Sequence, residues 1–341
     1  MKRRLWLSTF GAILLAAGLL GTQAPRSAAA PAPATQGAAG AVPSERPRVH
    51  SLKITILSTM LADDGIGEWG FAALVEVDGN RILYDTGARP TTVLQNAREL
   101  KIDLSGVRDV ILSHNHGDHT GGLVTLRREL SAQNPAALSR AYVAPGIFWS
   151  RPDGHGGEGN TTIAARREYE ALGGTVVENA KPAELFPGVW LTGPVPRVYP
   201  ERNWSVTGNV VTPTGAVEDN IPEDQALVFD TDRGLVMLTG CGHAGIVNIL
   251  DYARHAVRPA SIYAAIGGFH LFAADDAKLD WTAAKLHEMG VQNVLGAHCT
   301  GLHTVYYLKD KLGLPRQACL VGAVGATFTL EKGIAPGRLA Q

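Results

Sequence analysis

Three histidines and an aspartate lie within six consecutive residues, as His114, His116, Asp118 and His119. Neutral imidazoles and carboxylates are ligands for zinc, manganese and iron(II). Gly117 lets the backbone turn inside this cluster, so neighbouring side chains can face different ions. An ordinary polar surface turn rarely contains four such groups at this spacing. The histidine cluster therefore predicts a centre for two divalent metal ions, with zinc as the first choice and manganese or iron as alternatives.

Three further histidines, His243, His270 and His298, each follow an apolar run that predicts a strand. Active-site residues of α/β sheets gather where strands end, and glycines beside His243 and before His270 allow the backbone to approach a ligand closely. We predict that His243 binds metal and that His270 and His298 compete for the last ligand position. The one that does not bind metal would donate a proton to the leaving group. Asp118 would orient the attacking water as well as bind metal.

Two other residues could take part in the chemistry. Cys241 lies two residues before His243. It could be a thiolate ligand, because a metal lowers the pKa of a thiol, or it could be a small packed residue. Arg197 could hold an anionic substrate through its planar guanidinium group. The predicted partner is a small-molecule substrate that could be anionic.

Strands alternate with helices along most of the chain, which predicts an α/β fold. The expected strands cover residues 52–57, 71–77, 81–84, 107–113, 226–229, 235–239, 261–266 and 291–295, and the expected helices cover residues 90–100, 121–130, 244–256 and 276–289. The strand at 107–113 delivers the histidine cluster. The stretch from 151 to 223 is rich in glycine and proline, so it predicts long lid or binding loops.

The composition is that of a globular protein. Of the 341 residues, 45% are hydrophobic and 18% are charged, which is enough apolar material for a sizeable core. The formal net charge is -1, so no global basic field favours nucleic acid as a partner. Three cysteines are too few for a disulfide framework, although one pair could form in an oxidising compartment.

The first 48 residues differ from the rest. Lys2, Arg3 and Arg4 precede an apolar run, and small residues near Ala30 suit cleavage. Residues 1–30 therefore predict a signal peptide, and the alternative of a membrane anchor is disfavoured because the run is short for a spanning helix. Residues 31–48 are rich in alanine and proline and predict a disordered linker. We expect an exported protein, periplasmic or secreted, with a catalytic domain at 49–332 and no stable membrane insertion after cleavage.

The histidine cluster resembles the His-x-His-x-Asp-His motif of the metallo-β-lactamase superfamily. Leu83-Tyr84-Asp85-Thr86-Gly87 is similar to the upstream Asp-x-Gly turn of that superfamily. The resemblance implies a single-domain αββα sandwich of four layers. It also implies that His114 and His116 bind one metal, that Asp118 and His119 bind the second, and that Asp85 supports the histidine loop.

A narrower resemblance covers most of residues 50–330. Segments that include Glu223-Asp224-Gln225-Ala226-Leu227, Thr239-Gly240-Cys241-Gly242-His243 and His298-Cys299-Thr300-Gly301 look like the dihydropterin ribofuranosyl-aminobenzene phosphate synthase-like branch. That branch implies the fold and the site, but an exported protein does not fit its cytosolic pterin pathway. His155 is the only histidine between His119 and His243. Asp219, Glu223 or Asp224 could therefore fill the ligand position that a histidine usually takes there.

Together these patterns predict a metal-dependent hydrolase. A metal-bound hydroxide would attack an ester, a phosphoester or a related small molecule, because metal binding lowers the pKa of water towards 7. One alternative is a metal-dependent oxidoreductase on the same fold. Another is a non-enzymatic exported binding protein, against which the complete set of ligands argues.

Overall fold

The computed structural model of the chain describes residues 46–204 and 208–340. The predicted signal peptide at 1–30 and the predicted linker up to residue 45 lie outside the described residues, so both stay predictions. Among the helices that are described, none has the length and apolar character that a membrane crossing needs. At the start of the described chain, Arg46 donates a hydrogen bond of 2.8 Å to the carbonyl of Val257.

The first sheet has eight strands in the order β17-β16-β1-β2-β3-β4-β5-β6. These are β1 (Leu52–Ser58), β2 (Ala72–Val77), β3 (Asn80–Tyr84), β4 (Asp109–Ile111), β5 (Arg140–Val143), β6 (Thr175–Glu178), β16 (Thr327–Thr329) and β17 (Gly333–Ala335). Strands β2 and β3 form the antiparallel hairpin that the Asp78-Gly79 turn predicts. Strands β3, β4, β5 and β6 are parallel, so their carboxyl ends share one edge of the sheet.

The second sheet has seven strands in the order β15-β14-β13-β12-β11-β8-β7. These are β7 (Ala183–Phe186), β8 (Val189–Leu191), β11 (Ala226–Thr231), β12 (Gly234–Thr239), β13 (Ile262–Gly267), β14 (Asn293–Gly296) and β15 (Cys319–Val321). Strands β12 to β15 are parallel. A separate hairpin pairs β9 (Asn209–Thr212) with β10 (Gly215–Glu218).

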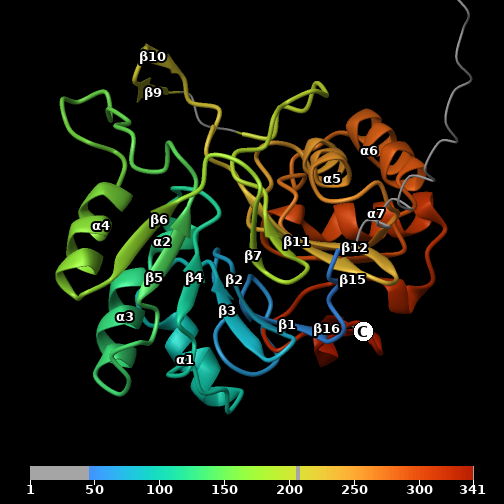
Figure 1. Cartoon of the computed structure of the whole chain (residues 1–341). Helices are drawn as coiled ribbons and strands as arrows, with labels where there is room; N and C mark the ends of the chain where they lie inside the picture. Colours follow the sequence, from blue (N-terminus) through green and yellow to red (C-terminus); the bar gives the residue numbers. More distant parts are fainter. Residues whose placement is uncertain (1–45, 205–207, 341) are drawn as a thin grey trace, which may run out of the picture. The chain divides into compact units, whose positions relative to one another are not determined.

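Seven α-helices lie in the described residues: α1 (Thr92–Glu99), α2 (Gly117–Thr120), α3 (Leu123–Ser131), α4 (Thr162–Ala171), α5 (Ile246–Ala256), α6 (Asp276–Glu288) and α7 (Leu302–Leu312). Short 3-10 helices are η1 (His298–Thr300), η2 (Arg316–Ala318) and η3 (Arg338–Ala340). Helices α1, α3 and α4 cover the first sheet, and α5, α6 and α7 cover the second (Figure 1). The predicted α/β fold is confirmed.

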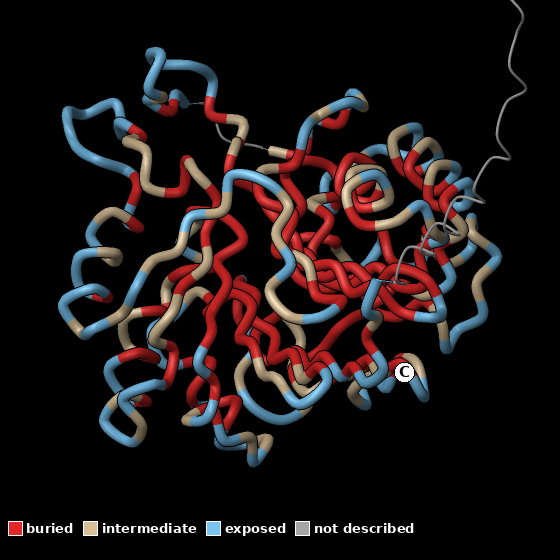
Figure 2. The backbone as a smooth tube through the Cα atoms, in the orientation of Figure 1, coloured by how far each residue is buried: buried red, intermediate tan, exposed pale blue. Residues whose placement is uncertain are grey.

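Three apolar clusters lie between these four layers and pack them together. One cluster joins the two sheets, with Ile54, Phe229 and Phe328 buried in it. The other two join each sheet to its own helices. The buried backbone accordingly runs through both sheets, and exposed backbone lies mainly on helices and loops (Figure 2). Burial of the apolar faces of both sheets explains the αββα arrangement.

The expectation of long loops between 151 and 223 is wrong in part, because α4 and strands β6 to β10 form there. These elements were not predicted because their sequences have little of the apolar periodicity that marks a helix or a strand. Only Thr162 and Tyr169 of α4 are buried, and β10 is exposed along its whole length. The packed region also continues through β17, past residue 332, where the sequence pattern placed the end of the domain.

Candidate metal centre

The predicted ligands converge because they follow the carboxyl ends of parallel strands. Asp85 follows β3, and the histidine cluster follows β4 in the first sheet. Cys241 and His243 follow β12, while His270 and His298 follow β13 and β14 in the second sheet. Five strand ends from both sheets therefore deliver their side chains to one place.

The first triad consists of His114, His116 and His243, whose ligand atoms lie within 4.8 Å of one another. The ring centroids of His114 lie 4.7 Å from those of both His116 and His243. His243 therefore lies beside the two histidines of the motif as the third possible donor. The side chains of Asp219, Glu223 and Asp224, the other candidates for the third ligand position, belong to none of the donor groups found in the described residues.

The second triad consists of Asp118, His119 and His298. The Oδ2 atom of Asp118 lies 3.2 Å from Nε2 of His298, which in turn lies 3.3 Å from Nε2 of His119. Cys241 lies beside both triads, with its Sγ 3.1 Å from Nε2 of His119. It also groups with His114 and His119 as a set of three donors. The sulfur therefore occupies the position between the two triads.

One buried carboxylate orients both triads. Oδ1 of Asp85 accepts a hydrogen bond of 2.7 Å from the backbone N–H of Ser113, and Oδ2 accepts one of 2.7 Å from the Ser113 hydroxyl. Oδ2 also lies 2.7 Å from Nδ1 of His119. The Ser113 hydroxyl accepts from Nδ1 of His114, at 2.8 Å. Because each Nδ1 carries its proton towards this carboxylate, the Nε2 lone pairs of His114 and His119 are left for a metal.

His243 is oriented by the backbone, since its Nδ1 lies 2.6 Å from the carbonyl oxygen of Asn203. Three site residues also adopt left-handed backbone conformations that side chains other than glycine rarely take. Their φ angles are 57° for Asp85 and 48° for both His270 and His298. Such strain persists where the surrounding structure holds it, and it is common at functional sites.

The metal-free site holds its imidazoles in different charge states. Burial, with the neighbouring imidazoles, lowers the pKa of His114 and of His243 well below its ordinary value, and burial lowers the pKa of His116 to about 4. The first triad is therefore neutral near pH 7 and needs no proton release before it binds metal. Burial opposes charge on His119, but the carboxylates of Asp85 and Asp118 outweigh it and raise the pKa to about 9.

The donors fit divalent cations. Nε2 of His114 and Nε2 of His243 are buried and have no hydrogen-bond partner among the described residues. Leaving such atoms unsatisfied costs about 1–3 kcal/mol each, and a shared cation would satisfy both. Imidazole, carboxylate and thiolate are together the ligand set of zinc sites. Metal binding by these residues remains a prediction, which the geometry supports.

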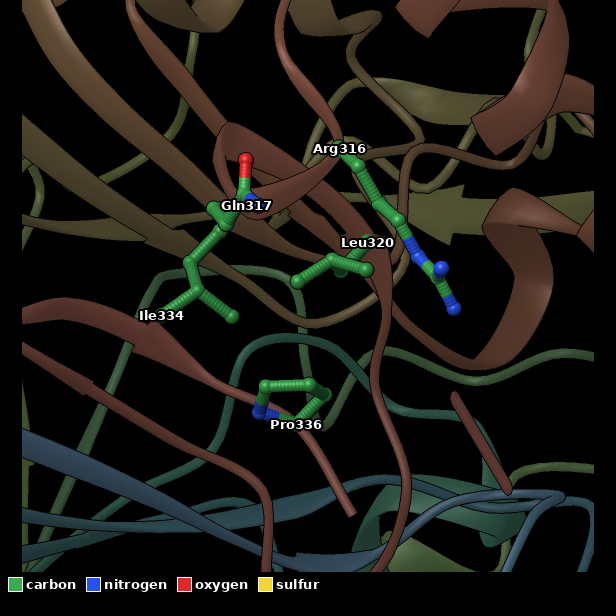
Figure 3. A pocket seen from close by; sticks show the side chains of 5 residues that line it. All are labelled: Arg316, Gln317, Leu320, Ile334 and Pro336. Carbon is green, nitrogen blue, oxygen red and sulfur yellow. The ribbon is translucent and has the colours of Figure 1, made fainter. Parts of the chain in front are cut away.

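His270 lies outside both triads, although it forms a further group of three possible donors with Cys241 and His243. Its ring centroid is 4.5 Å from that of His243. With Arg202, Trp204, Phe272 and Lys278 it also lines an open cavity of about 310 Å³. A second cavity, of about 300 Å³, is lined by Arg316, Gln317, Leu320, Ile334 and Pro336 (Figure 3). That second cavity shares no residue with the donor groups, so the cavity beside His270 is the better candidate for substrate.

Arg197 lies apart from the donor groups. Its Nη2 donates hydrogen bonds to the carbonyls of Asn220 and Ile221, the latter at 3.1 Å. Its guanidinium also lies 5.5 Å from the centre of the Trp204 ring. These contacts of Nη2 indicate that Arg197 supports the loop at residues 220–221, while its Nε is buried and has no hydrogen-bond partner among the described residues.

The sequence analysis missed Arg151. Its guanidinium pairs with Asp219 at 2.6 Å and with Glu223 at 2.8 Å, and all three side chains are at least nine-tenths buried. Oε1 of Glu223 accepts a hydrogen bond of 3.2 Å from the backbone N–H of Asn115, inside the histidine cluster. Arg151 therefore holds the loop that carries the metal ligands. Its place in a glycine-rich stretch provided no periodic signal that could reveal this.

Comparison with known proteins agrees with the fold. The family model of the metallo-β-lactamase superfamily matches residues 70–254, which include the histidine cluster and His243. The 7,8-dihydropterin-6-methyl-4-(beta-D-ribofuranosyl)-aminobenzene-5'-phosphate synthase of Methanocaldococcus jannaschii is 31% identical over 265 residues, 74% of this chain and 89% of the synthase. The chain belongs to the metallo-β-lactamase superfamily. Its resemblance to the synthase-like branch is confirmed as well.

Solved structures of metallo-β-lactamase proteins share this architecture. Tm1679, a metal-dependent hydrolase of the β-lactamase superfamily, matches with a TM-score of 0.64 and 29% identity, over 81% of this chain and 98% of Tm1679. Zinc-bound PqqB from Methylobacterium extorquens matches with a TM-score of 0.50 and 13% identity, over 81% of this chain and 99% of PqqB. At that identity PqqB supports the fold alone.

Replacing Asp85 by Asn should weaken zinc binding by roughly 10- to 100-fold, because the amide carries no charge to hold the Nδ1 proton of His119 and orients its ring less firmly. Competition titration with a chromophoric chelator measures this loss. Asp310→Asn, at an exposed carboxylate on α7, is the matched control and should bind zinc as the wild type does. Equal affinity in D85N and the control would refute the role of Asp85.

Replacing Arg151 by Met should lower the free energy of unfolding by about 3–5 kcal/mol, because two buried carboxylates lose their cation. Urea denaturation of the metal-free protein measures this change. Arg128→Met removes an exposed arginine that pairs with Glu168 at 3.8 Å, and it should cost at most about 1 kcal/mol. Similar losses in the two variants would show that the buried network does not hold the loop.

Proposed function

We propose that this chain is a metal-dependent hydrolase that acts on an ester, a phosphoester or a related small molecule. The main observation behind the proposal is that two groups of three possible metal donors lie on either side of the sulfur of Cys241. When bound there, two divalent cations, zinc in the first place, supply an activated water and draw negative charge from the substrate. The similarity of this chain to Tm1679, a metal-dependent hydrolase, supports hydrolysis as the reaction class.

We propose different roles for the two residues that compete for the last ligand position, His270 and His298. We assign His298 to the metal, because its Nε2 faces Asp118 and His119. We assign His270 to proton transfer, because it belongs to neither triad and borders the open cavity. A proton held on its ring can reach the leaving group of a substrate in that cavity.

Asp118 is the ligand placed to orient the attacking water. One fifth of its side chain is exposed, whereas those of His119 and His298 are fully buried. Although burial opposes its charge, His119 and His298 hold the pKa of Asp118 below the usual range. The carboxylate is therefore ionised near pH 7 and can accept a hydrogen bond from water at the open side of the centre.

We propose that the substrate enters through the cavity beside His270. Arg202 and Lys278 bring two cationic side chains to its lining, while Asp275 brings one carboxylate. This balance favours a substrate with an anionic group, a role that Arg197 does not take because its guanidinium is bound by backbone carbonyls. The similar synthase from Methanocaldococcus jannaschii has a phosphate in its product's name, which makes phosphoesters the first substrates to try.

Replacing His270 by Ala should leave two zinc ions bound and slow turnover by roughly 100- to 10,000-fold, because only the proton donor is lost. Replacing His298 by Ala should remove one ion as well as activity. Metal analysis gives the ion count, and a panel of alkyl phosphate monoesters, alkyl phosphate diesters, alkyl carboxylic esters and lactones, whose alkoxide leaving groups need a proton, gives the rates.

His303→Ala, at an exposed histidine on α7, is the control and should change neither ion count nor rate. Full turnover in H270A would reject the proton-donor role. Wild-type protein that binds two ions, hydrolyses nothing on the panel and shows redox activity with iron would overturn the hydrolase proposal in favour of an oxidoreductase.

A further inference from the structure

Two thiols lie next to each other beneath the metal centre. The Sγ atoms of Cys241 and Cys299 are 3.2 Å apart, although 58 positions separate the residues in the chain. Cys241 follows β12 and Cys299 lies in η1, which follows β14. Both cysteines are free and buried. The third cysteine, Cys319, lies in β15, and its thiol is directed at the carbonyl of Val305.

The sulfur of Cys241 has two competing sets of neighbours. On one side it lies 3.1 Å from Nε2 of His119, inside the proposed centre. On the other side it lies 3.2 Å from the sulfur of Cys299. A disulfide bond is about 2.05 Å long, so the two sulfurs need to approach by only about 1 Å. A thiolate that donates to a metal cannot at the same time form that bond.

We propose that Cys241 and Cys299 form a reversible disulfide when the centre is free of metal, and that this disulfide prevents metal from occupying the second triad. Formation of the bond requires only the two thiols. Its effect on metal rests on the proposed centre. If metal binds before oxidation, it holds the Cys241 sulfur and prevents its reaction with Cys299. If oxidation comes before metal, the disulfide removes the negatively charged thiolate from between the triads.

A peroxide is a sufficient oxidant. One cysteine loses its proton, its thiolate attacks an oxygen of hydrogen peroxide, the O–O bond breaks, and a sulfenic acid and a hydroxide form. The hydroxide takes up the proton that the thiol released and leaves as water. The second thiol attacks the sulfenic sulfur, the S–S bond forms, and a second water leaves. Two electrons and two protons thus pass from the thiols to the peroxide. Cys241 is buried, but a ring nitrogen of His270 lies within 4.8 Å of its sulfur. Because His270 also lines the open cavity, this cavity is the route that we propose for the peroxide.

The test treats the full chain, stripped of metal by a chelator, with hydrogen peroxide. After unfolding, the thiol count should fall from three to one, since the chain has three cysteines, and the intact mass should fall by two hydrogens. Peptide mapping should show Cys241 linked to Cys299. Zinc bound per chain should fall from two ions to one, because the first triad keeps all three of its donors, and a phosphine reductant should restore the second ion. Protein loaded with zinc before oxidation should keep all three thiols.

Cys299→Ser is the informative variant because it leaves Cys241 in the centre: after mild peroxide it should form no crosslink. Cys319→Ser is the matched control and should oxidise as the wild type does. An unchanged thiol count, a crosslink through Cys319, or oxidised wild type that holds as much zinc as the reduced form would overturn the proposal. If reduced protein binds no zinc while the crosslink forms, the metal centre fails and the disulfide stands.

Discussion

The buried carboxylate of Asp85 is the interaction on which the rest of the site depends. It accepts three hydrogen bonds, two from Ser113 and one from His119, and through the Ser113 hydroxyl it also orients His114. A Cβ atom at Gly240 would lie 2.6 Å from its Oδ2 and would also collide with Ser113. Glycine at this position therefore lets the end of β12, in the second sheet, approach the strand ends of the first. One charge thus aligns imidazoles of both triads and fixes how closely the two sheets meet at the site.

The αββα fold provides what this network needs. Two sheets packed face to face bring the carboxyl ends of parallel strands together at one edge, and the apolar cluster between the sheets holds them in place. The candidate ligands come from short loops and helical turns that directly follow strands, with Asp118 and His119 in α2 and His298 in η1. The left-handed φ angles of Asp85, His270 and His298 are therefore held by a rigid frame. The buried group of Arg151, Asp219 and Glu223 adds a second support on the side of the histidine cluster.

Much of this arrangement could be predicted from the sequence, because strong local signals mark it. The histidine cluster, the Asp85 turn and the alternating strands and helices predict the fold and most candidate ligands. What could not be predicted depends on contacts between distant segments. Nothing in the sequence ranks His298 above His270, since both follow strands and glycines, and only their places in the structure separate them. Arg151 gave no periodic signal, and Arg197 looked available until its partners in the loop at 220–221 were visible. Export rests on the first 30 residues and stays a prediction.

The central claim is that two cations sit between these side chains. The direct measurement is anomalous diffraction at the zinc edge from crystals soaked in zinc. We expect two peaks, one among His114, His116 and His243 and the other among Asp118, His119 and His298, with the sulfur of Cys241 within bonding distance of at least one. Imidazoles that point away from one another with no anomalous density between them, or zinc bound only elsewhere on the protein, would contradict this claim.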